Sequence, residues 1–205
     1  MLEPTLHALS SMRVILASGS PRRREIIKNL GINVECITSK YDENLDRSKY
    51  NNHGDYVQDL AYYKVQDVFN NLKTDSAKPS LILGADTIVT LGDEIFGKPK
   101  DAADAVRILS SLANKEHVVY TGVCMKTMEK EIKFYQSAKV TVGDISKEQI
   151  ESYVKTGEPM DKAGGYGIQG TGGCLIESIN GDFYTVMGMP LYTLVKNLNQ
   201  LYSSK

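Results

Sequence analysis

Long apolar stretches, closely spaced cysteines and an excess of charge of one sign are all missing from this chain of 205 residues. No apolar run approaches the roughly 20 residues that a membrane-spanning helix needs. The formal net charge is -1, so the chain lacks the global basic field that would attract DNA or RNA. The three cysteines, Cys36, Cys124 and Cys174, lie far apart, which argues against a disulfide framework and a zinc site. We therefore expect free thiols and no nucleic-acid or membrane partner.

The first residues of the chain do not have the pattern of a targeting signal. Residues 1–12 lack a basic n-region and a long apolar h-region, so they do not resemble a secretory signal. We expect them to form a short, mobile extension before the first strand. Together with the free thiols, this pattern predicts a cytoplasmic protein.

The composition is that of a folded domain, with 41% hydrophobic and 24% charged residues. Apolar periodicity predicts alternating strands and helices with one long hairpin inserted. The expected strands are 13–17, 33–37, 81–83, 87–90, 94–96, 118–126, 131–141 and 174–179, and the expected helices are 21–30, 55–72, 101–112, 146–155 and 190–201. This order favours a three-layer α/β fold with a mixed sheet, in which residues 13–202 form one domain with two lobes.

Ser18 to Arg24 follows the first expected strand and begins a helix, with Ser20 as its cap and Pro21 at its first position. A helix start exposes backbone N–H groups and the positive end of the helix dipole. Three successive arginines there oppose the dipole, so a bound anion would account for them. Arginine forks and the two serine hydroxyls suit phosphate oxygens. A solvated basic helix end explains the same pattern about equally well.

Asp86, in Gly84-Ala85-Asp86-Thr87, follows an apolar strand that we expect to end at Gly84. In open α/β sheets, ligands bind at the carboxyl ends of the strands. A carboxylate there can hold a divalent metal or orient a water, and Glu43 in the polar loop could supply a second carboxylate. The commoner role of a lone aspartate is to cap a turn.

Two lysines are candidates for phosphate contacts. Lys98 is held between Gly97 and Pro99, so the backbone directs its charge. Lys64 lies on the inward-leaning side of a helix that is rich in tyrosines. A surface turn and a snorkelling surface lysine are the alternative explanations of these two positions.

The segment Asp161 to Gly170 gathers glycines around one tyrosine and one glutamine. Glycines let a backbone approach a ligand closely. Gln169 offers a donor and an acceptor side by side, a pattern that pairs with the imide edge of uracil or thymine. A structural glycine-rich turn has the same composition, and the spacing fits neither a Walker A motif nor a Rossmann fingerprint.

Together, these segments resemble the Maf family of nucleotide pyrophosphatases. Six motifs occur in the family's order between about Arg13 and Leu201, which makes a chance match improbable. They are Leu16-Ala17-Ser18-Gly19-Ser20-Pro21-Arg22-Arg23, Gly84-Ala85-Asp86-Thr87-Ile88-Val89, Gly97-Lys98-Pro99, Thr121-Gly122-Val123, Asp161-Lys162-Ala163-Gly164-Gly165-Tyr166-Gly167-Ile168-Gln169-Gly170 and Asn180-Gly181-Asp182. Residues 1–12 lie outside the family pattern, and residues 46–53 match it poorly.

The resemblance implies a Maf/ITPase-like fold, with two lobes flanking a cleft, and commonly a homodimer. It implies hydrolysis of a nucleoside triphosphate to the monophosphate and pyrophosphate, with Mg²⁺ or Mn²⁺. Asp86 is similar to the family's catalytic residue, and Asp86 and Glu43 to its metal ligands. The implied phosphate-binding residues are Ser18, Ser20, Arg22, Arg23, Lys64, Lys98 and Lys162. Arg22, Thr87 and Gln169 fall at base-discriminating positions and are similar to the dTTP/UTP branch.

Two other functions fit parts of this sequence. One is a nucleotide-binding regulator of cell division with little catalysis, although the complete set of carboxylates and lysines favours an enzyme. The other is a pyrophosphatase for modified purine triphosphates. Within the favoured function, the ranking of dTTP, UTP and modified pyrimidines stays open, because one methyl group is worth only about 1–3 kcal/mol.

Overall fold

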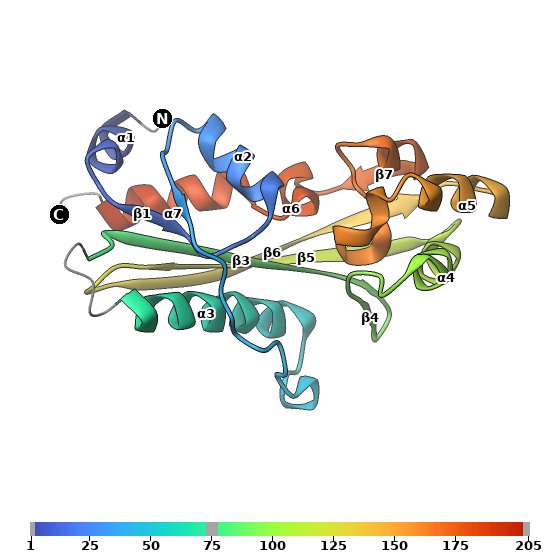
Figure 1. Cartoon of the computed structure of the whole chain (residues 1–205), viewed down its shortest axis with the longest axis horizontal. Coiled ribbons are helices and arrows are strands. Elements are labelled where there is room, and N and C mark those ends of the chain that lie inside the picture. The colour runs from blue at the N-terminus through green and yellow to red at the C-terminus, as the bar shows by residue number, and fades with distance from the viewer. Residues whose placement is uncertain (1–2, 73–77, 203–205) are drawn as a thin grey trace. The chain divides into compact units, whose positions relative to one another are not determined.

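The computed structural model describes residues 3–72 and 78–202, which fall into two compact units (Figure 1). Unit 1 draws on Met1–Asp86, Thr121–Gln136 and Gly188–Lys205, and unit 2 on Thr87–Tyr120 and Ser137–Met187. Each unit is therefore assembled from segments that are distant in the sequence. The composition of residues 74–79 predicts a connecting loop, and this segment lies partly outside the described residues.

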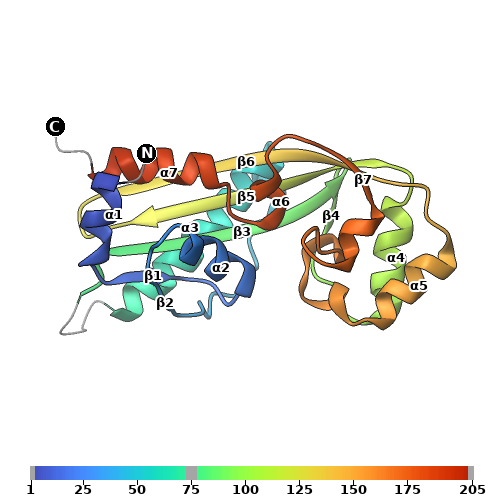
Figure 2. The same ribbon diagram turned by 90° about the horizontal axis from the view of Figure 1, so that it is seen from above.

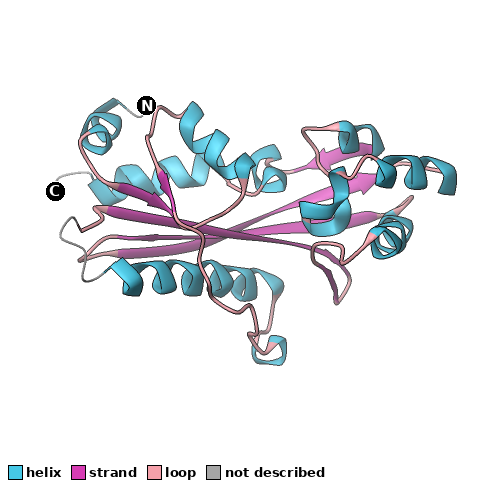
Figure 3. Ribbon diagram, in the orientation of Figure 1, coloured by secondary structure: helices cyan, strands magenta, loops and turns pink. Residues whose placement is uncertain are grey.

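A mixed sheet of seven strands has the order β2-β1-β3-β5-β6-β7, with β4 paired to β3. Strands are drawn in magenta and helices in cyan in Figure 3. The strands are β1 Val14–Leu16, β2 Glu35–Cys36, β3 Leu81–Leu91, β4 Glu94–Phe96, β5 Glu116–Lys126, β6 Glu131–Val142 and β7 Ile176–Asn180. β1 pairs in parallel with β2 and β3, whereas β3–β4 and β6–β7 are antiparallel. The expected α/β fold with a mixed sheet is confirmed.

Unit 1 contains the helices α1 Glu3–Ser10, α2 Pro21–Asn29, α3 His53–Leu72 and α7 Leu191–Tyr202, and the short 3-10 helix η1 Arg47–Lys49. Within this unit, α3 covers one face of the strands, and α2 and α7 cover the opposite face (Figures 1 and 2). The apolar spacing that predicted α3 is the stripe that it buries: Val57, Leu60, Ala61, Val65 and Val68. The three-layer arrangement thus follows from a helix with one apolar face.

Unit 2 contains α4 Ala102–Leu112, α5 Lys147–Lys155 and α6 Phe183–Met187, and the 3-10 helices η2 Glu158–Asp161, η3 Ala163–Gly165 and η4 Thr171–Leu175. α4 packs against α5 over a core that includes Ile108 and Leu112. α5 begins with a capping box: Ser146 Oγ accepts from the backbone N–H of Gln149, and Gln149 Oε1 accepts from that of Ser146. Gln149 and Ser146 therefore satisfy two donors that a helix start otherwise leaves open.

The expectation of a mobile extension over residues 1–12 is wrong for its described part. α1 packs against α7, and Leu9 is 2% exposed. The Thr5 hydroxyl donates to Asn199 Oδ1 at 2.6 Å. This segment is helical because it packs on α7 and buries Leu9. Local patterning does not reveal this packing, because the residues in contact, such as Thr5 and Asn199, are 194 positions apart in the sequence.

The prediction that an apolar strand ends at Gly84 is also wrong, because β3 runs without interruption from Leu81 to Leu91. A Cβ at Gly84 would overlap the Val65 side chain and lie 3.3 Å from the carbonyl oxygen of Ala61. The glycine therefore marks a close approach of α3 to the strand and not a strand end. Asp86 consequently lies inside β3.

Two smaller expectations also change. Ser20 is the N-cap of α2, but its side chain makes no cap hydrogen bond. The strand expected over residues 33–37 is reduced to Glu35–Cys36.

In the described part of the chain, no helix has both the length and the apolar character that crossing a bilayer requires.

Gly122 of β5 offers a test of the packing between strand and helix in unit 1. A Cβ at this position would overlap backbone atoms of Val57 and lie 2.6 Å from the Cα of Gln58 in α3. We expect Gly122→Ala to destabilise the protein by about 1–3 kcal/mol in urea unfolding, because a helix backbone cannot yield as a side chain can. Gly143→Ala, whose nearest contacts are at 3.9 Å, is the control. Equal stability of the two variants would contradict this packing.

Candidate active site

Three charged side chains of unit 1 meet where β3 faces α3. Lys64 Nζ lies 2.7 Å from Asp86 Oδ1 and 2.6 Å from Glu43 Oε1. The side chains of Lys64 and Asp86 are only 15% and 12% exposed, whereas that of Glu43 is 54% exposed. The structure thus brings these three predicted site residues together, with one ammonium between two carboxylates.

The alternation of strand side chains explains why Asp86 reaches Lys64. Positions 84 and 86 of a strand point to the same face. Gly84 lies against Val65 of α3, so Asp86 points toward the same helix and meets Lys64, the neighbour of Val65. The ion pair therefore depends on the close approach that the glycine permits.

Asp86 retains one carboxylate oxygen for other partners. Within the described residues, Lys64 alone hydrogen-bonds the Asp86 side chain, and it does so at Oδ1. Oδ2 is available to a water or a ligand, as a carboxylate acting as a base requires. The charge of Arg23 also interacts with Asp86, so two cations accompany the two carboxylates.

Arg23 ties the turn after β1 to the strand that carries Asp86. Its Nε donates to the carbonyl oxygen of Gly188 at 2.9 Å. Its Nη1 donates to the carbonyl oxygen of Ala85 at 2.8 Å and to Ser18 Oγ at 3.3 Å. Burial lowers the pKa of Arg23, and the Asp86 carboxylate opposes this effect. Arg23 therefore has a structural role, and its contact with phosphate stays a prediction.

The hydroxyl of Ser18 accepts two hydrogen bonds in the turn after β1. Ser18 is buried, and its Oγ accepts from the backbone N–H of Ser20 at 3.2 Å and from Arg23. Both bonds use the oxygen as acceptor, so the hydroxyl hydrogen remains to be donated. Arg22 and Ser20 are half-buried beside it at the start of α2. A hydroxyl donor at a helix start suits a phosphate oxygen.

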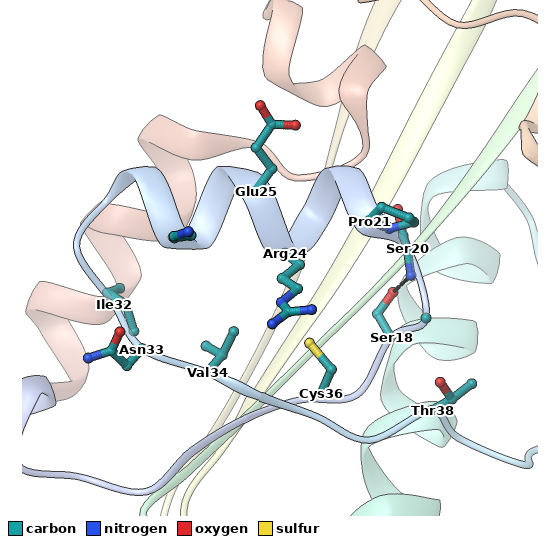
Figure 4. Close-up of a pocket in the computed structure, with 12 residues that line it drawn as sticks. Ser18, Ser20, Pro21, Arg24, Glu25, Ile32, Asn33, Val34, Cys36 and Thr38 are labelled. Atoms are coloured by element: carbon teal, nitrogen blue, oxygen red, sulfur yellow. Dashed lines mark hydrogen bonds between the residues drawn. The ribbon is translucent and has the colours of Figure 1, made fainter.

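A hollow of about 530 Å³ opens beside α2 (Figure 4). Its lining includes Ser18 and Ser20, and Arg24 extends into it toward Val34 and Cys36. None of Arg22, Arg23, Glu43, Lys64 and Asp86 lines it. The lining of the hollow contains a single carboxylate, Glu25, so the paired carboxylates are the stronger candidate for acid–base chemistry.

Tyr56 is a site residue that the sequence patterns did not single out. Burial raises the pKa of its hydroxyl, and the carboxylates of Asp86 and Glu43 raise it further. Its ring meets Tyr50 edge-on with centroids 5.4 Å apart, and the Arg47 guanidinium carbon lies 5.6 Å from its centroid. The tyrosines of α3 were visible in the sequence, but their spacing does not reveal which one faces the carboxylates.

The remaining predicted site residues belong to unit 2. Lys98 and Gln169 are exposed, and within the described residues neither side chain has a hydrogen-bonding or ionic partner. Thr87 is half-buried in β3. Lys162 Nζ donates to the carbonyl oxygen of Glu158 and to Asp161 Oδ1, both at 2.6 Å. Lys162 is thus engaged in its own loop, and its contact with phosphate stays a prediction.

A buried histidine anchors the glycine-rich segment of unit 2. His117, 1% exposed, shares a 2.8 Å hydrogen bond through Nε2 with the hydroxyl of Tyr166, and burial raises the pKa of that hydroxyl. Nδ1 of His117 is buried and has no hydrogen-bond partner among the described residues. Burial lowers the pKa of His117 to about 4, and Glu116 opposes this effect. The histidine is therefore neutral near pH 7.

The geometry defines a class: an α/β protein in which a buried lysine joins two carboxylates beside an arginine-bearing helix start. A family model described as Maf-like protein matches residues 13–201. A dTTP/UTP pyrophosphatase of Aquifex aeolicus is 47% identical over 93% of this chain and 96% of its own length. That of Bacillus cytotoxicus is 42% identical over 93% and 96%. The chain belongs to the Maf family.

A human relative has a longer chain. It is the probable bifunctional dTTP/UTP pyrophosphatase/methyltransferase protein, 43% identical over 98% of this chain. The match covers 34% of the human protein, so this chain spans about a third of its length. The similarity therefore concerns one part of that protein.

Arg23 allows a test of the clamp between the Ser18 turn and β3. Arg23→Leu would remove the guanidinium donors to the carbonyl oxygens of Ala85 and Gly188. We expect a loss of at least about 2 kcal/mol in the free energy of unfolding, measured by urea titration. The adjacent, exposed Arg24→Leu is the control and should stay within about 0.5 kcal/mol. Similar losses in both variants would argue against the clamp.

His117 makes stability depend on pH. The unfolded chain protonates this histidine near its ordinary pKa of 6.5, and the folded protein only near 4. Between these values the unfolded state binds more protons, so stability falls as the pH falls, by about 3 kcal/mol over the window. Thermal unfolding of His117→Gln between pH 4 and 6.5 should show a flatter dependence. The exposed His7→Gln should keep the wild-type slope, and an unchanged slope in His117→Gln would refute the assignment.

Proposed function

We propose that this protein hydrolyses dTTP, UTP and modified pyrimidine triphosphates to the monophosphate and pyrophosphate. The observation that carries this proposal is the Lys64 ammonium held between Asp86 and Glu43, with a free carboxylate oxygen on Asp86. The printed names of the bacterial relatives, at 42% and 47% identity over most of the chain, support the substrate class. The arginines at the start of α2 supply positive charge for a triphosphate.

The carboxylates fit a divalent cation that is shared with the substrate. Asp86 and Glu43 both lie within 2.7 Å of the same Lys64 nitrogen, so they converge on one position. Mg²⁺ is commonly bound through one or two carboxylates together with phosphate oxygens. The described residues contain no group of three or more His, Cys, Asp and Glu side chains that could form a complete protein cage. Asp86 and Glu43 would hold Mg²⁺ or Mn²⁺, which neutralises phosphate charge when bound.

Asp86 acts as the base in this proposal. Its Oδ2 accepts a proton from a water, while Lys64 holds Oδ1 and keeps the carboxylate in place. The water oxygen bonds to the α-phosphorus, the bond from that phosphorus to the bridging oxygen breaks, and pyrophosphate leaves with the electron pair. Lys98, Arg22 and the Ser18 hydroxyl bind phosphate oxygens. Catalysis of this kind depends mainly on positioning and on charge stabilisation.

Gln169 and Thr87 recognise the base, together with Arg22. The Gln169 amide donates to O4 and accepts from N3–H of uracil or thymine. Cytosine presents the reverse pattern at this edge, so CTP would set donor against donor and acceptor against acceptor at the Gln169 amide. The Gln169 side chain is exposed and has no partner in the part of the chain that the structure describes, which supports this role.

We further propose a cytoplasmic homodimer. The free thiols of Cys36, Cys124 and Cys174 fit a reducing compartment. Tyr192 on α7, 71% exposed, is a large ring of the kind that subunit interfaces cover. The molar mass in solution, measured by light scattering, decides the oligomeric state.

Pyrophosphate release from a panel of triphosphates tests the proposed function. We expect turnover of dTTP and UTP that requires Mg²⁺ or Mn²⁺ and is lost after chelation. Asp86→Asn should lower kcat by at least about a hundredfold, because the amide cannot take the proton. Asp93→Asn, in the exposed turn before β4, is the matched control and should retain wild-type turnover.

The panel also separates the other functions. Nucleotide binding without pyrophosphate release from any triphosphate would identify a binding protein. Preferential turnover of modified purine triphosphates would overturn the assignment of Gln169 and Thr87. Near-normal turnover by Asp86→Asn would overturn the mechanism.

A further inference from the structure

The carboxylate of Glu158 organises the glycine-rich segment of unit 2 from within. Its Oε1 accepts from the Tyr153 hydroxyl and from the backbone N–H of Gly172, both at 3.0 Å. Its Oε2 accepts from the backbone N–H of Thr171 at 3.0 Å. The Glu158 side chain, at the start of η2, thus binds the backbone N–H groups of two residues that lie 13 and 14 positions later in the sequence. The bonds close a loop that contains Gln169.

Three glycines of this loop make room for side chains that pack inside it. A Cβ at Gly170 would lie 2.6 Å from both carboxylate oxygens of Glu158, and one at Gly167 would lie 2.5 Å from Cε of Lys162 and 2.8 Å from Oε1 of Glu158. A Cβ at Gly172 would overlap the Tyr153 hydroxyl. The glycines therefore let the chain wrap closely around an internal carboxylate. The sequence had suggested that they approach a ligand.

The same loop is held on both sides of Gln169. The backbone N–H of Gly167 donates to the Tyr153 hydroxyl at 3.0 Å, two residues before Gln169. Glu158 binds the N–H of Thr171, two residues after it. Between these anchors, the N–H of Gly170 donates to the carbonyl oxygen of Gly167 at 3.2 Å. Gln169 itself is exposed and has no partner among the described residues, so its direction is set by its backbone.

We propose that Glu158 is a positioning residue for base recognition: its carboxylate, together with the Tyr153 hydroxyl, sets the backbone that presents Gln169 to the base. This inference rests on the proposed function. It assigns Glu158 no contact with the substrate. Its effect is on the choice of base, because the bonds it makes surround Gln169 and none reaches the carboxylates of unit 1 within the described residues.

The charge of Glu158 matters for this role. Burial acts to raise the pKa of Glu158, but hydrogen bonds from the backbone of Gly172 and from the Tyr153 hydroxyl outweigh it and hold the pKa below its ordinary value. The ionised group accepts at both oxygens. A glutamine side chain has nearly the same shape, but its NH2 group would replace one of the two accepting oxygens. That group would face a donor, and two donors cannot hydrogen-bond each other. Glu158→Gln therefore breaks the anchor with little change of volume.

Steady-state pyrophosphate release from UTP and CTP tests the inference. In Glu158→Gln, the UTP over CTP ratio of kcat/KM should fall at least about tenfold, mainly through a higher KM for UTP. Inhibition by inorganic tripolyphosphate, which has no base, should change by less than about twofold, because it reports phosphate binding alone. Glu151→Gln on α5 is the matched control, since its carboxylate pairs with Lys147 and does not touch the loop. This control should keep the wild-type ratio.

The outcomes separate the two proposals. If the wild type releases no pyrophosphate from UTP, the proposed function fails and the inference fails with it. If the wild type is active and Glu158→Gln keeps its UTP over CTP ratio, the positioning role alone is overturned. An equal loss with both nucleotides, accompanied by weaker tripolyphosphate inhibition, also overturns it, because that is the signature of general unfolding.

Tyr153→Phe keeps the inference testable if Glu158→Gln does not fold. This change removes only the hydroxyl that donates to Glu158 and accepts from Gly167. The UTP over CTP ratio should fall in the same direction, by at least about threefold, with tripolyphosphate inhibition retained. A wild-type ratio in the folded Tyr153→Phe protein would overturn the inference.

Discussion

The close approach of α3 to β3 is the constraint on which the rest of the candidate site depends. Gly84 has no side chain, so the helix packs directly on the strand at Val65 and Ala61. That contact places Lys64 beside Asp86, and the ammonium then draws in Glu43 from the loop. Removing two partly buried charges from water is unfavourable unless they pair, so the ion pair and the packing support each other. The arrangement of these three charged side chains thus depends on the absence of a Cβ at Gly84.

Both units use the same physical device near their functional residues. In unit 1, the Arg23 guanidinium binds the carbonyl oxygens of Ala85 and Gly188 and so connects segments distant in sequence. In unit 2, the Glu158 carboxylate binds the N–H groups of Thr171 and Gly172. A buried or half-buried ion that bonds to backbone groups can thus fix the course of the chain. Charged residues in a conspicuous motif can therefore serve the backbone next to the reactive groups.

Much of the fold was predictable, because its elements have strong local signals. The stripe of α3, the helix α5 and the hairpin strands β5 and β6 follow the expected periodicity. The errors have a common cause. Gly84 looks like a strand end, and residues 1–12 look like a tail, because helix packing that involves distant residues is invisible to a local window. Tyr56 and Glu158 were missed for the same reason.

The sequence by itself determined the α/β class, most element positions and the residue types of the site, because periodicity and ordered motifs are local properties. It also determined the Maf family. Only the tertiary structure decided that Asp86 lies inside β3 with Lys64 on one oxygen, and that Arg23 and Lys162 are engaged by the protein itself. The physical reason is that hydrogen-bond partners and close contacts depend on distances between segments, which no spacing along the chain encodes.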